Sequence, residues 1–169
     1  MEMLIRDARD EEQDFINELK LNAYEEHAHK IQEDHWNVLR NSVLSNAELQ
    51  KDVIRLVAEI DGKIVGSVAL FPAKMDAYKG LTDEKQDYPE IRMLAVSKEV
   101  RGKGVATALV NECIQRAKGK GYRSIGLHTA DFMEDAIDLY GRLGFERLTQ
   151  YDFEPSDDGV VVKAFRLKI

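Results

Sequence analysis

The sequence predicts a single domain of the α/β (α+β) class over residues 1–169. Two β-rich runs, 53–60 and 63–71, are joined by Asp61-Gly62, a dipeptide typical of a two-residue hairpin turn. A short apolar run at 91–96 is followed by apolar residues at spacings of three and four, which indicates an amphipathic helix. The chain has 169 residues, 44% of them apolar, which is enough for one hydrophobic core.

The first half of the chain is expected to contribute a strand at 3–6 and then a long helical stretch. Apolar residues recur at helical spacing from Asp10, and the helical pattern continues over 24–44 with many charged residues. After the hairpin, 72–89 is polar and is expected to be a connection.

In the second half, the amphipathic helix is expected to run from Val105 to a basic, glycine-rich stop at 118–121. Asp131 is expected to cap the next helix with Glu134 as its capping-box partner, and Gly144 is expected to end that helix. The strands expected around these helices are 122–128, 145–153 and 160–169.

The turn between the strand at 91–96 and the following helix is a candidate anion site. Arg101, Gly102, Lys103 and Gly104 stand directly before the helix. The first turn of a helix leaves about four backbone N–H groups without intrahelical partners, and the macrodipole adds roughly half a positive charge there. The glycines let a phosphate approach these groups, and the basic side chains add charge. A surface turn that only starts a helix is the structural alternative.

Two motifs resemble those of a known protein family. Arg101-Gly102-Lys103-Gly104-Val105-Ala106 follows directly on the strand segment 93–96, and Tyr140 precedes a Gly-Phe pair at 144–145. The first motif matches the pyrophosphate signature Gln/Arg-x-x-Gly-x-Gly/Ala, and the second matches the helix end, of the GNAT superfamily of acyl-CoA-dependent N-acyltransferases. The chain resembles that superfamily over essentially its whole length. No G-x-G-x-x-G and no G-x-x-x-x-G-K-[ST] motif occurs.

The resemblance implies a mixed, mostly antiparallel sheet of about six or seven strands flanked by helices, splayed between the strand at 91–96 and the strand at 122–128. It implies that acetyl-CoA binds in this splay, where backbone N–H groups hold the pantetheine arm and polarise the thioester carbonyl. The cofactor-binding residues implied in this way are Leu94, Ala95, Val96, Arg101, Gly102, Lys103, Gly104, Val105, Ala106 and Thr107.

The resemblance also implies catalytic residues. Tyr140 matches the tyrosine that protonates the departing sulfur, while its periodicity alone favours a core residue. Glu90 stands where many members place the carboxylate that takes the proton of the amine, and His128 stands where some carry a glutamate, so both are candidates for the base. Met133 is a departure, because relatives often have an asparagine there that contacts coenzyme A.

The function implied is transfer of acetyl from acetyl-CoA to a primary amine of a small molecule, peptide or protein, by direct attack in a ternary complex and without a metal. A non-catalytic acyl-CoA-binding sensor or partner module is the alternative. The sequence leaves open the acceptor, an acyl group longer than acetyl, and the oligomeric state, a homodimer included.

Charge is distributed unevenly along the chain. The net charge is −7, and residues 1–60, with 14 acids and 7 bases, contain all of the excess. Residues 98–123 instead have a local net charge of +5, which suits a polyanionic ligand such as coenzyme A. The overall acidity disfavours nucleic acid as the main partner. The acidic first third leads us to expect a cationic acceptor.

No segment resembles a targeting signal or a membrane span. The first twenty residues are studded with charge, and the longest apolar stretch, 64–71, is too short to cross a bilayer. We therefore expect a soluble, cytoplasmic protein with no membrane partner. Cys113 is the single cysteine and lies on the apolar face of the helix, so we expect it to pack in the core.

The charged stretch at 24–44 contains further candidates. His27, His29 and His35 lie among acids, but their spacing does not suit a metal site. Tyr24 and Trp36 are candidates for lining an acceptor pocket or for the core.

Overall fold

The computed structural model describes residues 2–73, 87–155 and 158–169. In these residues the chain forms one open sheet of seven strands in the order β1-β2-β3-β4-β5-β7-β6. Every neighbouring pair is antiparallel except β4 and β5, which are parallel, so the predicted mixed, mostly antiparallel sheet is confirmed. The strands are β1 Met3–Asp7, β2 Ile54–Ile60, β3 Lys63–Phe71, β4 Glu90–Val96, β5 Ser124–Ala130, β6 Glu146–Arg147 and β7 Val162–Lys168.

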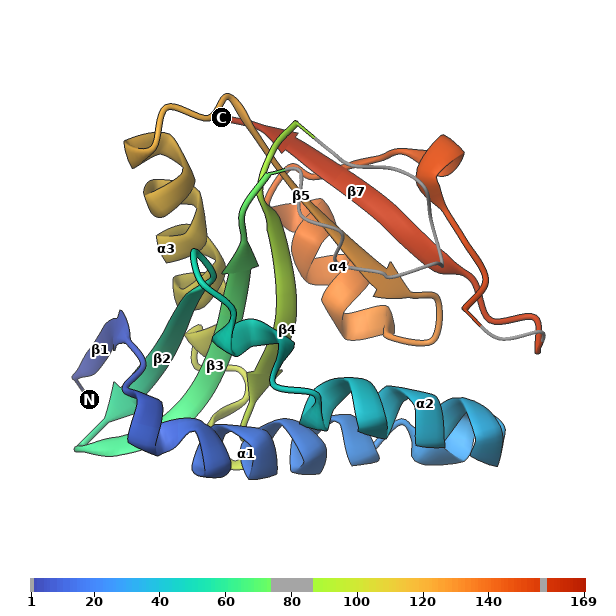
Figure 1. Cartoon of the computed structure of the whole chain (residues 1–169), viewed down its shortest axis with the longest axis horizontal. Coiled ribbons are helices and arrows are strands. Elements are labelled where there is room, and N and C mark those ends of the chain that lie inside the picture. Colours follow the sequence, from blue (N-terminus) through green and yellow to red (C-terminus); the bar gives the residue numbers. More distant parts are fainter. Residues whose placement is uncertain (1, 74–86, 156–157) are drawn as a thin grey trace.

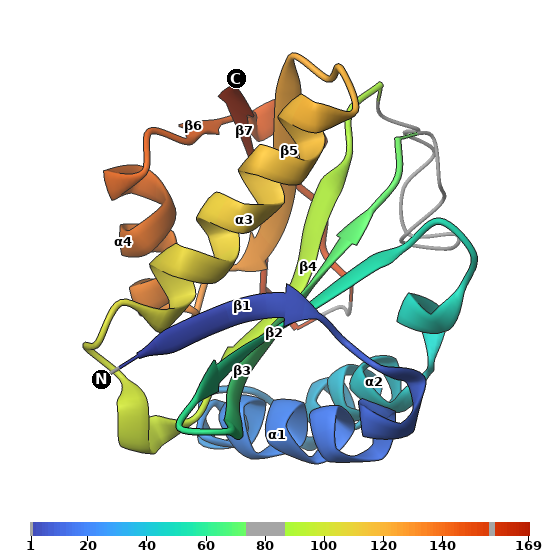
Figure 2. The same cartoon turned by 90° about the vertical axis from the view of Figure 1, so that its left-hand side faces the viewer.

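Helices cover both faces of the sheet (Figures 1 and 2). Helices α3 and α4 share the main hydrophobic core with one face, while α1 packs through Leu19 and Ala23 on the other face against Ala95 of β4. Helix α2 lies beside α1 (Figure 1). The helices are α1 Gln13–Glu25, α2 Glu33–Leu44, α3 Val105–Gly119 and α4 Glu134–Arg142.

The hairpin between β2 and β3 forms as the sequence predicts. Asp61 and Gly62 have φ values of 54° and 78°, so both central residues are left-handed, as a type I′ turn requires. The turn brings β2 and β3 together as antiparallel neighbours, which makes β3 the partner of β4 at the centre of the sheet.

Close packing on β3 positions α3. The apolar stripe of α3 is buried, and its Val105, Leu109 and Cys113 are at most 2% exposed. A Cβ atom on Gly66 of β3 would lie 2.9 Å from Val105 Cγ1 and 3.1 Å from Leu109 Cδ1. The first turn of α3 therefore has a fixed place beside β4, because neither surface can move closer or slide without a clash.

Two predictions about the second half were wrong. Asp131 does not cap α4, which begins at Glu134 after Met133. The Asp131 carboxylate instead accepts a hydrogen bond of 3.2 Å from the Val161 N–H just before β7. The expected strand at 145–153 is reduced to the two residues of β6, followed by a 3₁₀ turn at Thr149–Tyr151.

A side chain explains the short strand. The Ala164 N–H of β7 donates to the Asp152 carboxylate at 2.9 Å, so a side-chain oxygen takes the place of a ladder carbonyl. The expected strand at 122–128 forms two residues later, as β5, and most of the expected connection at 72–89 lies outside the described residues. Within the described ranges, no helix is both long enough and apolar enough to cross a membrane.

Candidate active site

The two central parallel strands separate soon after they meet. Among the described residues, β4 and β5 pair only at Glu90 with Gly126 and at Ile91 with Leu127. The strands then diverge (Figure 1). The predicted splay is therefore present, and the β5-facing edge of β4 is open from Arg92 onward.

A bulge in β4 accompanies the splay. Ser67 pairs with Ala95 but Ala69 pairs with Arg92, so β4 has one more residue than β3 in this interval. Met93 lies in this bulge and has a φ of 59°, a left-handed value that is unfavourable for a methionine. The Leu94 carbonyl accepts a hydrogen bond of 3.0 Å from the Tyr24 hydroxyl of α1. Tyr24 thus ties α1 to the bulge.

The basic turn leads directly into α3. Gly102 and Gly104 have φ values of 79° and 82°, and Gly104 is the N-cap of the helix. A Cβ at either position would meet no atom within 4 Å, so the backbone conformation, and not crowding, requires glycine. The first-turn residues Val105, Ala106 and Thr107 line a cavity, together with both glycines and Arg101. Lys103 is exposed on the turn and does not line it.

This cavity has a volume of about 790 Å³ and extends from the turn along β4 to α2. Leu94, Ala95 and Val96 line its middle, with Tyr140 and His128. Its far side is formed by α2, by the α1-facing side of β4 and by residues before β7, and we call this part the α2 wall. The α2 wall consists of His35, Val38, Leu39, Ser42, Arg92, Phe153 and Pro155.

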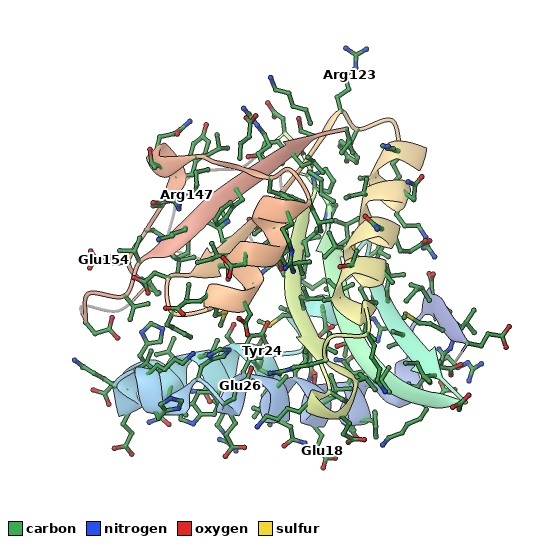
Figure 3. The ribbon with its side chains drawn as sticks, turned by 180° about the vertical axis from the view of Figure 1, so that it is seen from behind. Glu18, Tyr24, Glu26, Arg123, Arg147 and Glu154 are labelled. Carbon is green, nitrogen blue, oxygen red and sulfur yellow. The ribbon has the colours of Figure 1, made fainter. Side chains whose placement is uncertain are left out.

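A carboxylate already stands beside the turn. Arg101 Nη1 donates to Glu26 Oε2 at 2.5 Å, and Arg101 Nη2 lies 3.4 Å from the Val96 carbonyl. Burial opposes ionisation of Glu26, but the hydrogen bond and charge of Arg101 hold the pKa of Glu26 below its usual range. Figure 3 shows Tyr24 and Glu26 between α4 and the helices α1 and α2. Glu26 was not expected from the sequence, because 75 residues separate it from Arg101.

Tyr140 is buried at 4% exposure and still lines the cavity. Its ring packs edge-on against Phe145 with centroids 5.6 Å apart. Burial, with smaller effects of Tyr24 and Cys113, raises the pKa of Tyr140 well above its usual range, so the phenol stays protonated at neutral pH. No hydrogen bond of its hydroxyl is found within the described residues, and the residue lines the cavity. Both of the interpretations of Tyr140 from sequence, core residue and proton donor, fit this position.

The two candidate bases form one pair. Glu90 and His128 lie on adjacent strands, and the Glu90 carboxylate contacts His128 Nδ1. His128 Nε2 lies 3.3 Å from the Tyr151 carbonyl, and the ring lies 5.5 Å from the Phe153 ring. His128 lines the cavity, whereas Glu90 is 7% exposed and does not. The Glu90 carboxylate and the Tyr151 carbonyl are both hydrogen-bond acceptors, so each can take a hydrogen bond from a ring N–H.

Aromatic contacts connect α1 and α2 to the second half of the chain. Phe132, in the turn after β5, packs with its ring centroid 5.5 Å from His27 and 6.1 Å from His35. His35 Nδ1 lies 2.6 Å from the Asp158 carboxylate. Burial lowers the pKa of His27, and the nearby Lys30 adds to this effect. These contacts connect α1 and α2 to the turn after β5 and to Asp158.

The structure also places the remaining residues that the sequence singled out. Cys113 is fully buried, and burial raises the pKa of its thiol to about 12, so it is not a nucleophile. Tyr24 lines the cavity and Trp36 does not. Met133 lines the cavity, and its sulfur accepts a hydrogen bond of 3.5 Å from the Thr129 hydroxyl. In the described part of the chain, no three His, Cys, Asp or Glu side chains are grouped to hold a metal ion.

Comparison with known proteins agrees with this geometry. The model of the acetyltransferase (GNAT) family matches residues 5–145, and the chain belongs to this family. An uncharacterized N-acetyltransferase of Methanocaldococcus jannaschii is 39% identical over 90 residues, covering 53% of this chain and 38% of that protein. N-acetyltransferase family 8 member 2 of Rattus norvegicus is 37% identical over 95 residues, covering 56% of this chain and 39% of that protein. The matched segments thus span less than half of these relatives.

Solved structures share the whole fold. A GNAT acetyltransferase of Staphylococcus aureus Mu50 superposes with a TM-score of 0.72 at 18% identity, covering 99% of both chains. The PaiA N-acetyltransferase of Thermoplasma acidophilum, solved in complex with coenzyme A, superposes with a TM-score of 0.71 at 18% identity, covering 100% of both chains.

Proposed function

We propose that this chain is an N-acetyltransferase that transfers the acetyl group of acetyl-CoA to a primary amine by direct attack in a ternary complex. One observation carries the proposal: a single cavity joins the basic turn, the open edge of β4, Tyr140 and His128. The family match supports it, as does the coenzyme A complex of the Thermoplasma acidophilum neighbour. From the sequence alone we also propose a cytoplasmic location.

The turn is the proposed site for the diphosphate of coenzyme A. The N–H groups of Val105, Ala106 and Thr107 belong to the first turn of α3 and have no intrahelical acceptor there. Arg101 is the nearest lining cation, and its pairing with Glu26 means that a phosphate must compete with that carboxylate. Lys103, which is outside the cavity wall, remains a predicted rim contact.

The pantetheine arm is proposed to lie along the open edge of β4, with the thioester beside the bulge. In this position the backbone N–H groups of Leu94 and Val96 face the developing oxyanion, because β5 no longer pairs with this edge, whereas Ala95 pairs with Ser67 of β3. The Tyr24 hydrogen bond to the Leu94 carbonyl holds this part of the strand in place.

His128 is proposed as the base, with Glu90 behind it. A neutral ring protonated on Nδ1 donates to Glu90, and Nε2 takes the proton of the incoming ammonium. The imidazolium then finds a second acceptor, the Tyr151 carbonyl. The free amine attacks the thioester carbonyl, forming the C–N bond and a tetrahedral oxyanion.

Tyr140 is proposed as the acid. When the C–S bond breaks, the thiolate takes the phenolic proton, and the phenolate regains a proton from the nitrogen of the new amide. An ordinary thiol has a pKa of about 8.5, below that of a phenol, and burial raises the pKa of Tyr140 further, but burial in the same cavity should also disfavour a free thiolate. The proposed base His128 lies on β5 and the proposed acid Tyr140 lies on α4, and the folded chain brings both to one cavity.

Two measurements test the proposal. Acetyl-CoA at ~100 times its Kd stabilises a protein by about 2.7 kcal/mol, which corresponds to a Tm rise of several degrees for a chain of this size. ATP and NAD serve as controls and should give no comparable rise. No rise with acetyl-CoA would refute donor binding.

The variant Tyr140→Phe separates an enzyme from a binding module. It should lower kcat for amine-dependent thiol release by roughly 10²- to 10⁴-fold while acetyl-CoA affinity stays the same. Tyr122→Phe, which removes a phenol outside the cavity lining, is the matched control and should keep full activity. Acetyl-CoA binding without release of thiol to any amine would instead favour the non-catalytic sensor.

A further inference from the structure

The charges around the cavity do not select one kind of acceptor. Among the described residues, the lining includes three carboxylates and three guanidinium groups, those of Glu26, Asp135, Asp138, Arg92, Arg101 and Arg142. Both signs of charge therefore line the cavity, and Glu26 is already paired with Arg101. The open edge of β4, where the thioester is proposed to lie, gives a more specific indication of how the amine is held.

Tyr24 reaches this open edge from α1. Ala95 pairs with Ser67 of β3, and the backbone groups of successive strand residues point to opposite sides, so those of Leu94 point away from β3. The N–H and the carbonyl of one strand residue point to the same side, so the Leu94 carbonyl lies beside the Leu94 N–H that is proposed to bind the thioester. The Tyr24 hydroxyl donates to this carbonyl at 3.0 Å. Its oxygen therefore stands beside the proposed position of the thioester.

Packing between α1 and β4 fixes the place of this hydrogen bond. Ala23 and Ala95, the sequence neighbours of Tyr24 and Leu94, are buried in one cluster with Leu19, and Tyr24 packs against that cluster. In Figure 3 the side chain of Tyr24 lies between α1 and α4. The phenol is thus held between the helix and the splayed strand.

The Tyr24 side chain can meet a ligand only as a hydrogen-bond acceptor. A phenol has one proton to donate, and its oxygen can also accept. Burial raises the pKa of Tyr24 to about 12 against the opposing charge of Arg92, so the phenol keeps its proton at neutral pH and gives it to the Leu94 carbonyl. Tyr24 is nevertheless only partly buried and lines the cavity. Its lone pairs are the polar groups that remain for a ligand.

Tyr140 has the opposite character in the same cavity. Its hydroxyl has no hydrogen-bond partner in the described part of the chain, and it is the proposed proton donor to the departing sulfur. Tyr24 contributes to the raised pKa of Tyr140, so the two phenols are close enough to interact. One phenol therefore suits the sulfur, which needs a proton, and the other suits a group that has N–H to donate.

We propose that Tyr24 orients the attacking amine by accepting a hydrogen bond from one of its N–H groups. A free primary amine has two N–H groups and one lone pair. When the lone pair attacks the thioester carbonyl, the C–N bond forms and the nitrogen becomes positively charged. One of its two protons then leaves, and the other stays in the amide product. Tyr24 binds the N–H that stays, so that the lone pair is aimed at the carbonyl beside Leu94.

This contact assists the reaction and not only binding. The hydrogen bond to Tyr24 becomes charge-assisted as the nitrogen gains positive charge, so it is stronger in the transition state than in the complex with the free amine. The inference rests on the proposed function, because it needs a thioester at the open edge of β4 and an amine that attacks it.

Matched amines test the inference, with thiol release from acetyl-CoA as the assay. The primary amines are phenethylamine, L-phenylalanine, tri-alanine and Nα-acetyl-lysine methylamide, and each is compared with its N-methyl counterpart, which has one N–H fewer. We expect the unaltered protein to have a kcat/KM roughly tenfold or more higher for the primary member of each pair that reacts. An N-methyl group makes a free amine at least as nucleophilic, so intrinsic reactivity does not produce this order.

Variants of the phenols locate the effect. Tyr24→Phe removes the hydroxyl and keeps the ring, and it should reduce the preference for the primary amine by roughly tenfold or more while acetyl-CoA affinity stays the same. Tyr140→Phe should instead slow both members of a pair equally, since both reactions release the same thiolate. Tyr122→Phe, outside the cavity lining, should change neither rate. Acetyl-CoA binding and Tm of each variant show that it is folded.

Failure of the inference differs from failure of the proposed function. Equal use of both members of a reacting pair by the unaltered protein overturns the inference. An equal loss for both members in folded Tyr24→Phe also overturns it, because Tyr24 would then only hold the bulge. If Tyr24→Phe does not fold, the preference of the unaltered protein decides. Absence of thiol release with every primary amine overturns the proposed function itself.

Discussion

The ion pair between Glu26 and Arg101 should weaken coenzyme A binding. The pair lies at the basic turn, where the diphosphate is proposed to bind, and its side chains are 27% and 38% exposed. Binding of a phosphate at Arg101 has to displace or share that contact, and the Glu26 carboxylate repels the incoming anion. Glu26→Gln removes the charge and keeps the size of the side chain, so it should tighten coenzyme A binding.

The expected gain follows from the exposure of the pair. Ion pairs that are partly open to solvent contribute about 0.2–1 kcal/mol. If binding no longer has to offset this free energy, the Kd falls by a factor of about 1.4 to 5. The gain should shrink at high salt, because the screening length falls from about 10 Å at 0.1 M to about 3 Å at 1 M.

Isothermal titration calorimetry with coenzyme A, at low and high salt, measures this change. Glu25→Gln is the matched control, since Glu25 is the exposed neighbour of Glu26 and its loss changes the net charge equally. A tighter Kd in both variants would mean that only net charge matters. A weaker Kd in Glu26→Gln would refute the reasoning and show that Glu26 helps by orienting Arg101.

Other perturbations test the fold around the site. Gly66→Ala should destabilise the protein by about 1–3 kcal/mol and weaken coenzyme A binding, because the added Cβ pushes the start of α3 away from β3. A hydrogen bond from Arg6 lowers the pKa of Glu12 from 4.5 to about 2, so its contribution to Tm is full above pH 4.5 and is lost as the pH falls toward 2. The buried Cys113 should react with a thiol reagent at pH 8 only after unfolding.

Each of these outcomes has a control. Gly119→Ala, at the end of α3 where a Cβ meets no atom, should leave coenzyme A binding unchanged, and equal losses in both glycine variants would contradict the packing explanation. Glu12→Gln should flatten the acid limb of the Tm profile, and Glu11→Gln should not. Rapid labelling of Cys113 in the native protein would mean that the core opens locally.

Local patterns predicted much of the fold. The positive φ angles of Asp61 and Gly62 and the helix that begins at Val105 follow from preferences of a few neighbouring residues, and the structure has both. The expected cap at Asp131 failed because its carboxylate bonds to Val161, 30 residues away. The expected strand at 145–153 failed for a similar reason, a side chain that replaces a ladder contact.

The sequence alone supplied the residues proposed for the chemistry: the basic turn, Tyr140, and the two candidate bases Glu90 and His128. Their residue types and motif spacing are properties of short segments and survive without the fold. Only the tertiary structure decided how they combine, since 38 residues separate Glu90 from His128 and 75 separate Glu26 from Arg101. Such contacts depend on strand order and on helix packing across the sheet, which no short pattern encodes. They bring the two alternative bases together as one pair, and they pair several acids of the first third with cations of the fold.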